Sequence, residues 1–223
     1  MADCPDPVTA LRRLIAGNER YRNDLRSVNS LASQLLRGDM TEGQRPFAIV
    51  LSCSDSRAPA EILFDVGVGD LFVIRVAGNI VAPSGIGSVE FAAATFGTRL
   101  VVVMGHTGCG AVTATLDVLQ GEGTVVSDNL RDIVNRIRPS ARTVLELTTG
   151  RPREEQLAAA VRANVRLAVD RLRRGSTILE ELADSRQIAI VGAIYDLADR
   201  RVELLDVPEM LRPALEPEAP GAG

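Results

Sequence analysis

The sequence predicts an α/β fold: a single domain with a mainly parallel central sheet, an antiparallel edge strand, flanking helices and an N-terminal helical arm. Two observations carry this prediction. Four short runs are almost continuously apolar, which is typical of strands that are covered on both faces. Stretches with the spacing of amphipathic helices separate these runs, and strands that alternate with helices form a parallel sheet.

Five strands are predicted. They cover residues 47–52, 71–77, 100–105, 188–195 and 201–205. The first four are the apolar runs, so we expect them to form the buried parallel part of the sheet. The fifth follows a tight turn and alternates polar with apolar residues. We therefore expect it to pair antiparallel at one edge of the sheet.

The predicted helices divide the chain into an arm, a core and a tail. They cover 7 to about 38, 84–96, 110–120, 129–137 and 154–173, where apolar residues recur at helical spacing. The first is too polar in its middle to be core, so residues 1–44 are predicted to form an arm on the domain or on a partner subunit. The α/β core covers 45–207, and the proline-rich residues 208–223 are predicted to be a loose tail.

Composition excludes several classes of function. The 223 residues carry a net charge of −4 without a long basic stripe, which argues against a nucleic-acid partner. No apolar stretch approaches the roughly 20 residues of a membrane span, and the N-terminus does not resemble a signal peptide, so we expect no membrane partner and a cytoplasmic location. All 25 basic residues are arginine, which excludes a lysine base or Schiff base.

The three cysteines are Cys4, Cys53 and Cys109. An odd number in a chain expected to be cytoplasmic argues against a disulfide framework and favours a metal site or a catalytic thiol. Cys4 lies among prolines near the start of the chain, and there we expect a disordered, exposed thiol.

Two motifs place polar ligands at the ends of predicted strands. Cys53 begins CSDSR directly after the first strand, and HTGCG, with the only histidine, His106, and with Cys109, follows the third. If these strands are neighbours whose connections run to opposite sides, a crevice opens between their carboxyl ends. Two thiolates and an imidazole select zinc, and three protein ligands leave a fourth position open, as in catalytic zinc sites.

The residues between the strands supply a carboxylate and a guanidinium. Asp55 projects to the same side as Cys53, where it can accept a hydrogen bond from a zinc-bound hydroxide. Arg57 can pair with Asp55 and keep it ionised. Three alternatives stay open: a surface ion pair between Asp55 and Arg57, two buried core thiols, and a structural zinc with Asp55 as a permanent fourth ligand.

These motifs resemble the β-class carbonic anhydrases, whose pattern is Cys-x-Asp-x-Arg followed further along the chain by His-x-x-Cys. The resemblance extends over residues 46–117, which include GDLFVIRVAGN at 69–79 and GSVEFA at 87–92, and it resumes at GAIYD, 192–196. Both motifs are present in the same order and in the same predicted strand context, which makes the resemblance specific.

The resemblance implies an enzyme that hydrates carbon dioxide reversibly to bicarbonate and a proton by a zinc-bound hydroxide. It implies Zn2+ on Cys53, His106 and Cys109, with Asp55 and Arg57 as the catalytic pair and Asp55 as a conditional fourth ligand. It also implies a homodimer or homotetramer with the site near the subunit interface.

The regulatory bicarbonate site of one subgroup uses a tryptophan, an arginine and a tyrosine. Here the arginine position matches Arg75, but Val50 and Gly192 stand at the other two positions, so we expect no such regulation. Some members place a glutamine near the substrate. This chain has Val66 and Gly67 there, so no amide is assigned to the site.

Carbon dioxide is expected to lie against apolar side chains, for which Val66, Phe72 and Val89 are the candidates, some from a neighbouring subunit. With no second histidine, the proton must leave through water, buffer or another side chain. Three other functions are weighed against hydration: hydrolysis of carbonyl sulfide or carbon disulfide by the same site, a non-catalytic zinc-stabilised interaction domain, and thiol redox chemistry. The last would use Cys53 and Cys109, which do not form Cys-x-x-Cys.

Overall fold

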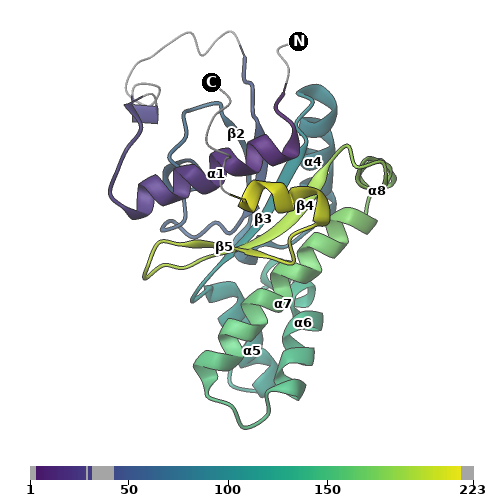
Figure 1. Ribbon diagram of the computed structural model, residues 1–223. Helices are drawn as coiled ribbons and strands as arrows, with labels where there is room; N and C mark the ends of the chain where they lie inside the picture. Colours follow the sequence, from purple (N-terminus) through teal and green to yellow (C-terminus); the bar gives the residue numbers. More distant parts are fainter. Residues whose placement is uncertain (1–3, 29, 32–42, 217–223) are drawn as a thin grey trace.

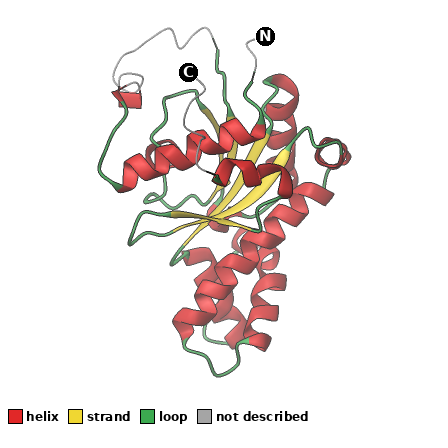
Figure 2. Ribbon diagram, in the orientation of Figure 1, coloured by secondary structure: helices red, strands yellow, loops and turns green. Residues whose placement is uncertain are grey.

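The computed structural model describes residues 4–28, 30–31 and 43–216, and its centre is one five-stranded sheet between helices (Figures 1 and 2). The strands lie in the order β2-β1-β3-β4-β5. Four are parallel, and β5 pairs antiparallel with β4. Their bounds are β1 (Ala48–Ser52), β2 (Leu71–Arg75), β3 (Leu100–His106), β4 (Ala189–Tyr195) and β5 (Val202–Leu205). The predicted fold class is confirmed.

The sheet has a hydrophobic core on each face. Every residue of β1, β3 and β4 is buried, as the apolar runs predict. Alternate side chains point to opposite faces of a strand. In β3, Val101 and Val103 therefore belong to one core, whereas Leu100, Val102 and Met104 belong to the other.

The helices cover the two faces unequally. One face packs against α4 (Pro83–Thr95), α5 (Gly110–Gln120), α6 (Asp128–Leu147), α7 (Arg153–Arg174) and α8 (Thr177–Asp184). The other packs against α1 (Pro7–Arg22), α3 (Ala60–Leu63) and the 3-10 helix η3 (Glu209–Leu215). No helix in the described ranges has the length and apolarity that a membrane span needs.

Two glycines let α7 lie directly on the sheet. A Cβ added at Gly105 of β3 would come within 2.7 Å of Val165 Cγ2, and one added at Gly192 of β4 within 2.9 Å of Val165 Cγ1. Carbon atoms in contact are about 3.5–4.0 Å apart, so neither position admits a side chain without displacing the helix. The buried face of α7 is thereby held close to the carboxyl end of β3.

The strand order creates a crevice at the carboxyl ends of β1 and β3. After β1 the chain crosses through α3 to β2 on one side, whereas after β3 it crosses through α5 to α8 to β4 on the other. Neighbouring parallel strands whose connections leave in opposite directions open a ligand-binding crevice between their ends. The arrangement expected from the sequence is present.

The N-terminal helix is shorter than predicted. It ends at Arg22, because Asn23 caps it and Asp24 adopts a left-handed φ of 55°. Only 30–31 of the stretch beyond 28 that was predicted as helix is described, and 32–38 lie outside the described residues. The apolar stripe of α1 packs on the chain's own sheet, with Leu11 and Leu14 each 1% exposed. Helix α1 of the predicted arm therefore lies on the domain.

Two predictions for the ends of the chain are wrong. Residues 209–215 form η3 instead of a loose tail, because Leu211 and Ala214 are buried and Arg12 on α1 donates to Pro213 O at 2.7 Å. Cys4 is ordered and half-buried; its Sγ lies 3.9 Å from Pro46 O. Residues 217–223 lie outside the described part of the chain.

Helix α6 extends past the predicted end at Ile137. It continues through Pro139 to Leu147, because Ala141 and Val144 on its far half are buried in the core. Packing of an apolar face thus outweighs the hydrogen bond that proline removes from a helix. The short helices α3 and α8 were not predicted at all.

Candidate metal centre

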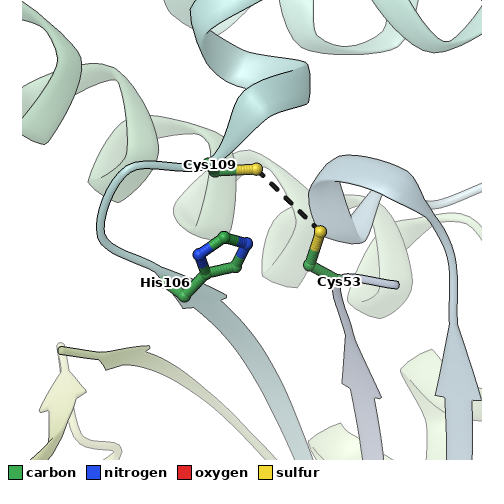
Figure 3. A group of neighbouring side chains, drawn as sticks. All are labelled: Cys53, His106 and Cys109. Atoms are coloured by element: carbon green, nitrogen blue, oxygen red, sulfur yellow. Dashed lines mark hydrogen bonds between the residues drawn. The ribbon is translucent and has the colours of Figure 1, made fainter. Parts of the chain in front are cut away.

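Two cysteine sulfurs and an imidazole converge in the crevice between β1 and β3 (Figure 3). Cys53 directly follows β1, His106 is the last residue of β3, and Cys109 is the N-cap residue of α5. One ligand atom from each lies within 4.8 Å of the others, and all three residues are buried. The structure therefore brings together the three residues that the two motifs nominate.

The imidazole of His106 is oriented for a metal. Its Nδ1 lies 2.9 Å from Thr107 O, and a carbonyl oxygen can only accept, so Nδ1 carries the hydrogen. The neutral ring then has its lone pair on Nε2. This atom is buried and has no hydrogen-bond partner among the described residues. A buried polar atom without a partner is costly, and a metal ion would satisfy it.

The two sulfurs have the spacing of ligands to one ion. Cys53 Sγ and Cys109 Sγ are 4.0 Å apart, and both cysteines are free. Two sulfurs on one tetrahedral zinc ion, each at 2.3 Å, would be about 3.8 Å apart. The hydrogen bond from Cys109 lowers the pKa of Cys53, and the same bond raises the pKa of Cys109. The pair thus holds one proton, which a divalent cation would displace.

Arg75 and Gly78 hold the loop that carries Cys53. From the end of β2, Arg75 Nε donates to Cys53 O at 3.2 Å and Arg75 Nη2 donates to Asp55 O at 2.5 Å. From the 3-10 turn η2 (Ala77–Asn79), Gly78 N donates to Cys53 Sγ at 3.3 Å. Three hydrogen bonds from one neighbouring segment therefore restrain this loop.

Asp55 lies beside the three ligands and is gripped by Arg57. Arg57 Nη2 and Nε donate to the two carboxylate oxygens at 2.8 and 3.0 Å, and the Arg57 backbone N–H donates at 2.9 Å. The Arg57 side-chain hydrogen bond holds the pKa of Asp55 well below its usual range. Asp55 Oδ2 is 3.7 Å from His106 Nε2, so an ionised carboxylate borders the metal position.

Other predicted or overlooked residues fall into two groups. Two of the three apolar candidates share a core: Val89 is 0% exposed there, and Phe72 packs against it and contacts Phe91 of α4, whereas Val66 belongs to the core on the opposite face. Sequence reasoning missed Arg75 and Gly78 as supports of the Cys53 loop. The only signal for them is their place at the end of β2 and just beyond it, which a parallel sheet aligns with the end of β1.

The comparisons with known proteins agree with this geometry. The family profile described as carbonic anhydrase matches residues 48–202. The carbonic anhydrase of Mycolicibacterium smegmatis is 41% identical over 89% of this chain and 93% of its own. The β-carbonic anhydrase CafA of Aspergillus fumigatus is 26% identical and superposes with a TM-score of 0.70, over 90% of this chain and 94% of its own. The chain belongs to the β-class carbonic anhydrases.

Further members of the family cover the chain almost completely. Carbonic anhydrase 2 of Mycobacterium tuberculosis is 36% identical over 90% of this chain and 94% of its own. The β-carbonic anhydrase CcaA is 26% identical with a TM-score of 0.69, over 88% of this chain and 95% of its own. The family is one of enzymes, and its cysteine–histidine–cysteine cluster in this chain is compatible with zinc. The alternative functions are not favoured.

Proposed function

We propose that this β-carbonic anhydrase hydrates carbon dioxide reversibly to bicarbonate and a proton, with Zn2+ held by Cys53, His106 and Cys109. The observation that carries the proposal is the convergence of the three ligand atoms within 4.8 Å of one another, together with a His106 Nε2 that has no hydrogen-bond partner among the described residues. The reaction is the one that the names of the relatives imply.

Three protein ligands leave a fourth position for solvent or substrate. Zinc held by the three protein ligands would lower the pKa of a water bound at the fourth position toward neutral pH and so supply a nucleophile. The protein must then orient this group and receive its hydrogen bond. Asp55 is suited to that task, because its carboxylate is ionised, cannot donate a hydrogen bond and borders the metal position.

Arg57 is proposed to set the position of Asp55. Its two side-chain hydrogen bonds occupy the carboxylate and draw it toward solvent, since 60% of the Arg57 side chain is exposed. If Arg57 released it, the carboxylate could turn toward the metal and act as a fourth ligand. We therefore propose Asp55 as a conditional ligand and Asp55 and Arg57 together as the catalytic pair.

The proton is proposed to leave through water or buffer. His106 is the only histidine of the chain, and its Nδ1 is already bonded to Thr107 O. No second imidazole can therefore carry the proton to solvent. We expect the maximal hydration rate to rise steeply with buffer concentration. A rate that is already saturated in dilute buffer would contradict this route.

We also propose a homodimer or homotetramer in the cytoplasm. Strand β2 lies at an edge of the sheet, and beside it Phe91, 54% exposed, contacts the rings of Phe72 and Phe96. An open strand edge with an exposed aromatic side chain favours a second copy as partner. Free thiols at all three cysteines suit a reducing compartment.

Stopped-flow hydration of carbon dioxide across pH 7 to 9, beside metal analysis of the same sample, tests the function. We expect about one zinc per chain and hydration that far exceeds the uncatalysed rate. A protein that holds one zinc per chain and shows no hydration at any of these pH values would refute the proposal. The same sample would then be assayed with carbonyl sulfide and carbon disulfide.

A further inference from the structure

A buried asparagine on α7 points at the segment that supports the Cys53 loop. Asn164 is 2% exposed and lies among the apolar residues of the buried face of α7, next to Val161 and Val165. Its Nδ2 donates to Gly78 O at 2.8 Å. A buried polar side chain on an apolar helix face needs a hydrogen-bond partner. An apolar side chain at position 164 would need none. The choice of asparagine therefore calls for a role at Gly78.

Gly78 is confined from several sides. Its φ is 68°, in the left-handed region that favours glycine, and an added Cβ would lie 2.8 Å from Ile137 Cδ1 and 3.0 Å from Ala111 Cβ. Its carbonyl is held by Asn164, and its N–H donates to Cys53 Sγ at 3.3 Å. Asn164 is thus linked to a metal-binding sulfur through a single residue.

We propose that Asn164 is a positioning residue for the metal centre: by fixing Gly78, it aims the Gly78 N–H at Cys53 Sγ and so sets how strongly that sulfur donates to the metal. The inference rests on the proposed function, because it needs a metal on Cys53. It concerns only the protein's own hydrogen bonds and adds no ligand to the site.

The expected effect follows from the electron density on sulfur. A hydrogen bond to a thiolate withdraws density from it, so the sulfur binds the metal less covalently and leaves the metal a stronger Lewis acid. Without Asn164, the Gly78 peptide is free to turn away, and the Cys53 thiolate becomes a stronger donor. Changes to residues that orient metal ligands commonly weaken metal binding or activity by about 10–100-fold.

The test uses the full-length protein loaded with Co2+, whose sulfur-to-cobalt charge-transfer absorption reports thiolate donation directly. In Asn164→Leu, we expect this band to move to lower energy than in the parent. We also expect Co2+ affinity, measured by competition with a chromophoric chelator, to fall about tenfold, because the Cys53 loop is no longer held in place and this loss of ligand orientation outweighs the stronger donation. The smaller Asn164→Ala also lacks the N–H donor and should move the band in the same direction, so it replaces the leucine variant if that one does not fold.

Asn18 offers a matched control. It is 5% exposed, and its Nδ2 donates to Leu63 O at 3.1 Å and to Arg200 O at 3.0 Å, on the other face of the sheet. Asn18→Leu therefore also removes a buried asparagine amide from backbone carbonyls. We expect it to lower the thermal midpoint while leaving the cobalt band and affinity unchanged.

Gly78→Ala probes the same peptide from its other side. The new methyl group must push against Ile137, so the peptide should shift with Asn164 intact and move the band as Asn164→Leu does. A parental cobalt spectrum in folded Asn164→Leu or Asn164→Ala would overturn the proposal. So would an equal band shift in Asn18→Leu. A parent that binds no Co2+ through thiolates would instead show that the proposed metal site itself is wrong.

Discussion

The two loops that carry the proposed metal ligands are held in different ways. After β3, the ligands belong to regular structure: His106 ends the strand, Cys109 caps α5, and Thr107 N donates to Tyr195 O of the neighbouring strand at 3.0 Å. After β1, Cys53 and Asp55 lie on an irregular loop. That loop depends on Arg75, which donates to both of their carbonyl oxygens, and on Gly78.

The difference in exposure follows the same division. The His106 side chain is 2% exposed, whereas those of Asp55 and Arg57 are 17% and 60% exposed. The loop after β3 can therefore serve as a fixed ligand platform. The loop after β1 combines one buried ligand with a carboxylate that meets solvent, as exchange of substrate and protons requires. We therefore expect changes in the loop after β3 to affect metal binding, and changes at the exposed residues of the loop after β1 to affect catalysis.

The largest effect is expected for a ligand on the fixed platform. Cys109→Ser replaces a thiolate by a hydroxyl that zinc binds poorly, so zinc content should fall from about one per chain toward zero and hydration should fall to background. Cys4→Ser is the matched control, because Cys4 is half-buried beside Pro46, outside the site. Metal analysis and stopped-flow rates check both variants. Full zinc content in Cys109→Ser would show that the loop after β3 is not needed to hold the metal.

The next effect separates catalysis from binding on the exposed loop. Asp55→Asn keeps the shape of the side chain but loses the charge that Arg57 stabilises. We expect zinc content to be unchanged and kcat/KM to fall by about 10²-fold or more, the usual contribution of a positioned proton acceptor. If the variant hydrates carbon dioxide at the parental rate, Asp55 has another role.

A smaller effect is expected when the support of the exposed loop is removed. Arg75→Leu deletes the donors to Cys53 O and Asp55 O but leaves every ligand in place. We expect kcat/KM to fall about tenfold, in the range for residues that orient a metal site. Arg174→Leu, which loses only an exposed ion pair with Asp170, is the control and should be neutral. Equal rates in both variants would mean that the loop holds its shape without Arg75.

The smallest effect is expected when a hydrogen bond that holds the loop after β3 is removed. Thr107 Oγ1 accepts a hydrogen bond from Leu197 N at 3.0 Å, and Thr107→Val removes it. We expect the free energy of unfolding to fall by about 1 kcal/mol, with zinc content and rate retained. Chemical denaturation measures the loss. Thr143→Val, on the exposed side of α6, is the control. A large loss of zinc in Thr107→Val would show that the platform is less independent than its geometry indicates.

The site could be predicted further from the sequence than the periphery of the fold could. Cys53, His106 and Cys109 follow apolar runs that are typical of buried strands, and the ends of parallel strands meet at one edge. No such rule covers the ends of the chain. Whether Leu211 and Ala214 pack, or where α1 stops, depends on surfaces that the rest of the fold supplies. Helix α6 shows the same limit, because burial beyond Pro139 decides its length.

The sequence alone determined the fold class and nominated the three metal-binding residues and the Asp55–Arg57 pair, because hydrophobic periodicity and ligand chemistry act locally. Only the tertiary structure decided which residues hold them. Arg75 and Gly78 reach the Cys53 loop from positions 20 to 25 residues away along the chain, and Asn164 reaches Gly78 from 86 residues away. Their hydrogen bonds exist only once β2, η2 and α7 have packed against the end of β1, and no local pattern encodes such contacts.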